Sequence, residues 1–140
     1  MRNMYTRLLF TSILLICGSG LFAQSSNDST KEDLSRIFVT EQVKPSFIGG
    51  IDSLNNFLNL EVNTYGATDG ERSIVKFIVS SKGNIYQVSG VNLSFGKSLV
   101  RALLKSSGQW KGGFQNGRYV NAICTISITF YNNRIEAVMR

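Results

Sequence analysis

The residue types that carry out most enzyme chemistry are scarce in this chain of 140 residues. The sequence contains no histidine, which is the commonest general base and the commonest metal ligand. Its two cysteines are Cys17 and Cys124. Serine and threonine hydroxyls are numerous, but a hydroxyl is a weak nucleophile without an adjacent base. The sequence therefore predicts a protein that is not an enzyme and that holds no cofactor and no metal.

The acidic residues stand at ordinary solvated positions. Asp52 and Glu61 fall at the expected start and end of a helix, and Asp69 and Glu71 fall at a turn. A carboxylate in the first helical turn is favoured by the helix dipole alone, so Asp52 needs no catalytic explanation. No two acids form an evident pair for acid–base work.

The basic residues are dispersed along the chain, although the formal net charge is +6. No block of like charge marks a nucleic-acid footprint, so no nucleic-acid partner is expected. The glycine pairs at 49–50 and 112–113 match no phosphate-binding pattern. The charge favours an acidic partner or an anionic surface.

The N-terminus has the order of features that is typical of a secretory signal peptide. The basic start Met1–Arg7 precedes the apolar segment Leu8–Ile16, and small residues then lead to a cleavage point before Gln24. Residues 1–23 are therefore predicted to be a signal peptide, and the mature protein to be periplasmic or otherwise exported. Two alternatives remain open: retention of the segment as an inner-membrane anchor, and lipidation at Cys17.

Cleavage would leave Cys124 as the only cysteine, so no intramolecular disulfide is expected and the core must stabilise the domain. Cys124 stands among apolar neighbours, which favours a small buried residue over a reactive thiol. Residues 24–43 are predicted to form a polar leader, and residues 132–140 a C-terminal tail.

Hydrophobic spacing predicts an α+β domain at residues 44–131. An apolar face at helical spacing starts at Ile51, and residues 73–89 alternate as a hairpin around the turn at Gly83. A second helical stripe runs from Phe95 to Leu104, with Ser94 as its expected N-cap. The predicted order is helix-strand-strand-helix-strand, with two helices packed on a three-stranded antiparallel sheet.

A long strand follows Trp110 and a glycine-rich turn. From Tyr119 to Tyr131 apolar and polar residues alternate, over a longer stretch than the usual strand of about 5–6 residues. The apolar face is predicted to be core and to contain Val120, Ala122, Cys124, Ile126, Ile128 and Phe130. The strand is predicted to be a sheet edge that captures a partner's strand through its backbone. The predicted partner-binding residues are Tyr119, Asn121, Ile123, Thr125, Ser127 and Thr129.

Four segments in order resemble the TonB C-terminal domain, in the versions common in Bacteroidota-type bacteria. They are the run Val43–Gly50 with its Pro-x-Phe-x-Gly-Gly pattern, the hairpin around Gly83, the helical stretch Leu99–Leu104 followed by the turn at Trp110-Lys111, and the strand after Asn116-Gly117. The resemblance covers residues 44 to 130. It implies the same fold of two helices on a three-stranded sheet.

The resemblance also implies a function. Proteins of that family couple inner-membrane energy to outer-membrane receptors, and a receptor segment pairs with their last strand, here Tyr119 to Phe130. The expected partner is an outer-membrane receptor segment or another envelope protein. This chain has glycine or serine where the family has proline, at Gly66, Ser107-Gly108 and Gly112. Its leader is short and contains no proline run, so we expect binding without energy transduction. A membrane-anchored short transducer and a self-associating structural domain, with a possible homodimer, remain the alternatives.

Overall fold

The computed structural model describes residues 32–140. The predicted signal peptide at 1–23 and the leader residues 24–31 lie outside the described residues. The fold is α+β, as the sequence predicts, with ten short or medium elements in residues 46–139.

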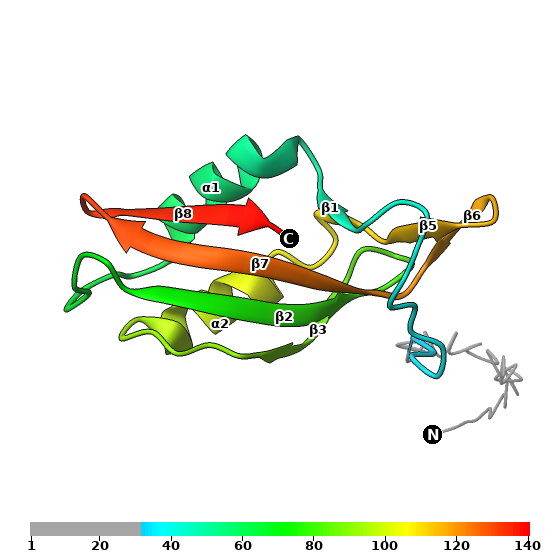
Figure 1. Ribbon diagram of the computed structural model, residues 1–140, viewed down its shortest axis with the longest axis horizontal. Coiled ribbons are helices and arrows are strands. Elements are labelled where there is room, and N and C mark those ends of the chain that lie inside the picture. Colours follow the sequence, from blue (N-terminus) through cyan, green and yellow to red (C-terminus); the bar gives the residue numbers. More distant parts are fainter. Residues whose placement is uncertain (1–31) are drawn as a thin grey trace, which may run out of the picture. The chain divides into compact units, whose positions relative to one another are not determined.

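A four-stranded antiparallel sheet in the order β3-β2-β7-β8 supports the fold (Figure 1). Its strands are β2 (Arg72–Val79), β3 (Ile85–Ser89), β7 (Ala122–Tyr131) and β8 (Arg134–Met139). β7 pairs with β2 from Ala122 to Thr129, and on its other side with β8 from Ile126 to Tyr131. β7 is therefore an interior strand along most of its length.

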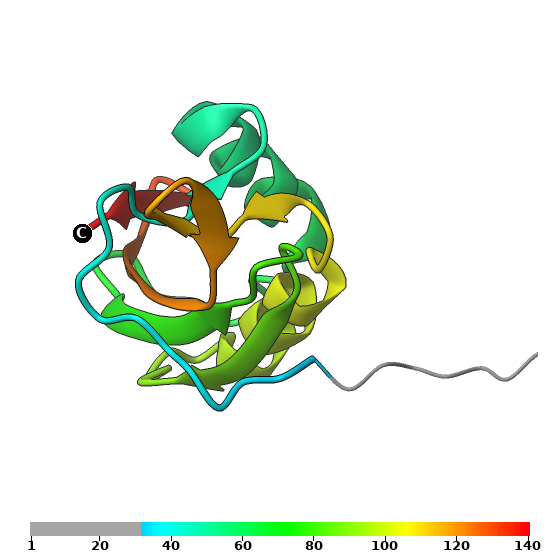
Figure 2. The same ribbon diagram turned by 90° about the vertical axis from the view of Figure 1, so that its right-hand side faces the viewer.

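Two helices lie over one face of this sheet (Figure 2). They are α1 (Gly50–Glu61) and α2 (Gly96–Lys105). Both present aliphatic side chains to the core, where Leu54, Leu58, Leu99 and Leu103 are fully buried. The inward face of β7 meets them, and the six residues predicted for that face are all buried. Removing these side chains from water is the main stabilising term of the domain.

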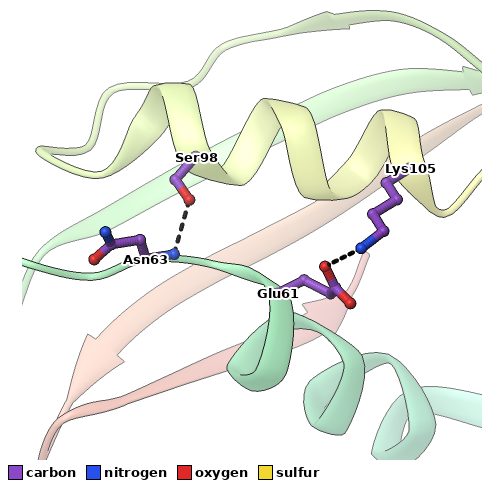
Figure 3. A network of polar contacts seen from close by, with 4 residues as sticks. All are labelled: Glu61, Asn63, Ser98 and Lys105. Atoms are coloured by element: carbon purple, nitrogen blue, oxygen red, sulfur yellow. Dashed lines mark hydrogen bonds and ion pairs between the residues drawn. The ribbon is translucent and has the colours of Figure 1, made fainter.

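Polar contacts join the end of α1 to α2 (Figure 3). The Lys105 ammonium lies 2.6 Å from a Glu61 carboxylate oxygen. The amide of Asn63 donates a hydrogen bond of 2.8 Å to the hydroxyl of Ser98. The ion pair is exposed and contributes little, of the order of 0–1 kcal/mol. Its role is to align two helices whose packing is set by the core.

Trp110 is a core residue. It belongs to β4 (Trp110–Lys111), which pairs with β1 (Ser46–Phe47). Its ring is 3 % exposed and packs edge-on against Phe47 and Phe77, with 5.2 Å between ring centroids in both cases. Its indole N–H donates to the Ser106 hydroxyl at 2.8 Å, so the buried donor is satisfied.

Three expectations were wrong in detail. The sheet has four strands and not three, because residues 134–139 of the expected tail form β8. The long strand is interrupted at Asn121: Tyr119 lies in β6 (Arg118–Val120), which pairs with β5 (Gly113–Gln115), and β7 begins at Ala122. Ser94 does not cap α2, because its amide and hydroxyl both donate to the Glu71 carboxylate.

The outer edge of β8 is covered by two asparagine side chains of α1. The amide of Ile135 donates to the Asn59 side chain at 2.8 Å, and its carbonyl accepts from the same side chain at 2.8 Å. Ala137 and Asn55 form the same reciprocal pair, at 2.7 and 3.4 Å. Helical residues four apart are about 6 Å apart along the axis, close to the two-residue repeat of a strand. The two carboxamides therefore form the hydrogen bonds that the backbone of a neighbouring strand would form.

We expect that Asn55→Ala and Asn59→Ala will each lower the free energy of unfolding by about 1–3 kcal/mol, because each leaves a strand amide and carbonyl without partners. The double variant should also associate in sedimentation velocity, because it uncovers a sheet edge. Asn56→Ala is the matched control, since Asn56 is exposed on the same helix and its side chain forms no hydrogen bond within residues 32–140. Equal stability of all three single variants in urea unfolding would contradict the edge-covering role.

Candidate partner-binding edge

The structure contradicts the prediction that the long strand is a free sheet edge. From Ile126 to Thr129 one side of β7 pairs with β2 and the other with β8, and the β8 pairing continues to Tyr131. The amide of Arg140 extends this cover by donating to the carbonyl of Thr125 at 3.0 Å. Partner residues predicted at Ser127 and Thr129 therefore have no unpaired backbone to offer. The physical reason is the C-terminal strand, which turns back and takes the edge.

The N-terminal part of β7 extends beyond β8, and the leader covers it. Phe38 forms a parallel bridge with Ala122. Its amide donates to the carbonyl of Asn121 at 2.8 Å, and its carbonyl accepts from the amide of Ile123 at 3.3 Å. The edge from Asn121 to Thr125 is thus occupied by a single residue of the chain's own leader and by the chain end.

The Asn121 side chain fastens the leader to this edge. Its amide nitrogen donates to the carbonyls of Asp33 and Arg36, at 2.8 and 3.1 Å. Its oxygen accepts from the amide of Ser81 at 2.9 Å. Asn121 was predicted as a partner-binding residue, and here its side chain binds the leader of its own chain. The remaining leader is held further on, where Val43 and Phe114 exchange backbone hydrogen bonds of 2.9 and 3.1 Å.

The other predicted site residues lie on the sheet face opposite the helices, except Tyr119. Ile123 is 37 % exposed, Thr125 and Thr129 are half-buried, and Ser127 is buried between its neighbours. Tyr119 lies in the β5–β6 hairpin and packs edge-on against Phe114, with 5.4 Å between ring centroids. The structure therefore places Tyr119, Asn121 and Ile123 near the part of the β7 edge that the leader covers. Ser127 and Thr129 lie farther along β7, where β8 pairs with it.

The second sheet edge, β3, is short and irregular. Its pairing with β2 shifts register between Lys76 and Ile78, and Gln87 opposite this shift has a φ of 52°. A left-handed residue in a strand bends it and disturbs its outer row of amides and carbonyls. Such a bulge is a usual protection of an edge. Tyr86 and Ser89 are the paired positions on either side of it, so β3 offers no regular ladder to a partner.

Two groups, one in β7 and one just before β2, have pKa values that their surroundings shift. Cys124 is buried, and burial raises the pKa of its thiol to about 12. A thiol held protonated in this way is a poor nucleophile. Hydrogen bonds from Ser94 and Thr68 lower the pKa of Glu71, so this carboxylate serves the β3–α2 connection. In residues 32–140 no three acids or cysteines gather closely enough to hold a metal ion.

Comparison with protein-family models, with curated proteins and with solved structures gave no match to this chain. Neither helix among residues 32–140 is long and apolar enough to cross a membrane.

The Cys124 thiol predicts a loss of stability in alkali. Its pKa is about 12 in the folded state against 9.0 ordinarily. The folded protein therefore keeps a proton that the unfolded chain loses above pH 9.0. The stabilisation is complete below pH 9.0 and is lost as the pH rises toward 12, at about 1.4 kcal/mol per pH unit.

The measurement is urea unfolding from pH 8 to 11 in a Cys17→Ser background, with Cys124→Ala as the reference. Tyrosines and lysines titrate in both proteins, so the difference between the two slopes isolates the thiol. Parallel pH profiles would mean that Cys124 ionises as readily in the folded as in the unfolded chain.

Proposed function

We propose that this protein is an exported, non-catalytic protein-binding module of the cell envelope. An extended segment of a partner adds as a strand to β7 at Asn121–Thr125, in the place that the leader occupies. The observation that carries this proposal is the leader itself: Phe38 already pairs with this edge through two backbone hydrogen bonds. The edge here exchanges backbone hydrogen bonds with one residue of another segment, and an extended segment of another protein meets the same donors and acceptors.

The leader is a weak competitor for this position. Its two backbone bonds at Phe38 and the two that Asn121 donates are each worth only about 0.5–1.5 kcal/mol net. Phe38 is only half-buried, so little apolar surface is lost when it leaves. Replacement of the leader by a partner segment leaves the backbone hydrogen bonds among β2, β7 and β8 intact. Partner binding therefore needs no unfolding of the core.

The resemblance of residues 44–130 to the TonB C-terminal domain supports a partner of the receptor type. In that family the long strand after the tryptophan turn receives the receptor segment, and β7 is that strand here. The partner is accordingly a segment of an outer-membrane receptor or of another envelope protein. The signal-peptide pattern at 1–23 supports the compartment.

Ile123→Pro should abolish capture of the partner, because it removes the amide that donates to the edge occupant and leaves the β2 side of the strand unchanged. Ile123→Thr is the matched control, since it keeps the amide and a β-branched side chain. We expect at least a tenfold loss for the proline variant alone, measured as envelope proteins retained on immobilised protein. Circular dichroism verifies that both variants fold. Equal capture of the partner by a folded Ile123→Pro variant would refute partner binding at this edge.

Phe38→Pro should instead strengthen partner binding, because it removes the leader amide that donates to Asn121 and so vacates the edge. Val39→Pro is the control, since the Val39 amide donates no hydrogen bond within residues 32–140 and its side chain is 76 % exposed. A photo-crosslinker placed at Tyr119 reports edge occupancy, with Leu60 on α1 as the reference position. Weaker crosslinking to the partner in Phe38→Pro than in Val39→Pro would show that the leader helps to form the site.

A further inference from the structure

A second surface lies on α2, away from the β7 edge. A hollow of about 490 Å³ is lined by Val91, Leu93, Gly96, Lys97, Val100 and Arg101. We call it the α2 groove. The connection from β3 forms one wall and the solvent-facing side of α2 forms the other. None of the residues that line the groove belongs to β7 or to the leader.

The groove combines apolar walls with two cations that have no acidic partner. Val91, Leu93 and Val100 are half-buried: Val91 and Leu93 lie in the connection before α2 and pack against the core, and Val100 lies on α2. Lys97 and Arg101 are exposed and stand four residues apart, so their side chains are neighbours on the helix surface. Within residues 32–140 the only ion pair is that between Lys105 and Glu61.

An adjoining hollow continues the surface on the other side of the two cations. It shares Leu93, Lys97 and Arg101 with the α2 groove, and it reaches Tyr65, whose side chain is 94 % exposed. Glu71 accepts hydrogen bonds from Ser94 and Thr68 and forms no ion pair with Lys97 or Arg101. Exposed tyrosine, arginine and aliphatic groups around one depression are the composition of a protein-binding hot spot.

We propose that the α2 groove binds an acidic segment of a protein partner that carries one apolar side chain. The apolar side chain lies against Val91, Leu93 and Val100, and flanking carboxylates pair with Lys97 and Arg101. Charge complementarity selects this occupant, because the groove has two cations and no acidic lining residue. The arginine guanidinium forms bidentate bonds with a carboxylate, which adds orientation to attraction.

The probe is a short synthetic peptide with a central leucine flanked by glutamates, and its counterpart has glutamines in their place. We expect the acidic peptide to bind the full chain at least tenfold more tightly than the glutamine peptide, by fluorescence anisotropy at low salt, and added salt to weaken it. Lys97→Glu with Arg101→Glu should abolish this preference. Lys76→Glu with Lys82→Glu, which changes the net charge equally on other surfaces, should keep it.

Val100→Ser separates groove binding from simple charge attraction, because it leaves both cations and removes an apolar wall. This variant should bind the acidic peptide severalfold more weakly than the unchanged protein does. Equal binding of both peptides, equal loss in both double variants, or binding of anionic lipid vesicles without binding of the peptide would overturn the proposal. The β7 edge is tested separately, since Ile123→Pro leaves the groove intact and a failure at either surface does not imply a failure at the other.

Discussion

The backbone hydrogen bonds on the two sides of β7 are the interaction on which the rest of this structure depends. The strand pairs with β2 on one side and with β8, Arg140 and Phe38 on the other. Because side chains alternate along a strand, fixing its register also fixes which face is core. The inward face from Ala122 to Phe130 then positions both helices, and the outward face is left to solvent. A shift of one residue would put Cys124 and Ile126 into water.

Each of the three exposed edges of the sheet is protected from pairing with another chain in a different way. The outer edge of β8 is paired with the carboxamides of Asn55 and Asn59. The edge at β3 is short and bent by the left-handed residue Gln87. The exposed start of β7 is covered by the leader at Phe38. Only the last of these devices is a separate segment of chain that can leave without disturbing a helix or a strand. Edge protection and partner binding are therefore compatible at that position alone.

The local patterns predicted both helices and three of the eight strands, and long-range pairing explains what they missed. The two helices, the hairpin around Gly83 and the buried face of β7 were all predictable from periodicity. β8 was missed, although the pair Asn132-Asn133 is a sequence signal for a tight hairpin turn. In the structure both residues adopt the left-handed conformation of such a turn, with φ of 50° and 58°. The pairing of Phe38 with Ala122 joins residues far apart in sequence, and no local pattern encodes it. For this reason the sequence predicted a free edge along the long strand, whereas that edge is covered by β8, Arg140 and Phe38.

The shortness of the accessible edge limits how tightly it can bind. A partner strand that replaces Phe38 can use only the backbone from Asn121 to Thr125 before it meets Arg140, which already donates to Thr125. Each backbone hydrogen bond contributes about 0.5–1.5 kcal/mol net, whereas association costs at least several kcal/mol. The leader lowers the apparent affinity further, because it must be displaced first. A useful affinity therefore requires contacts beyond the strand. If one partner bears both an edge-pairing strand and an acidic segment, the α2 groove supplies such contacts, and two weak sites on one linked partner together exceed either alone.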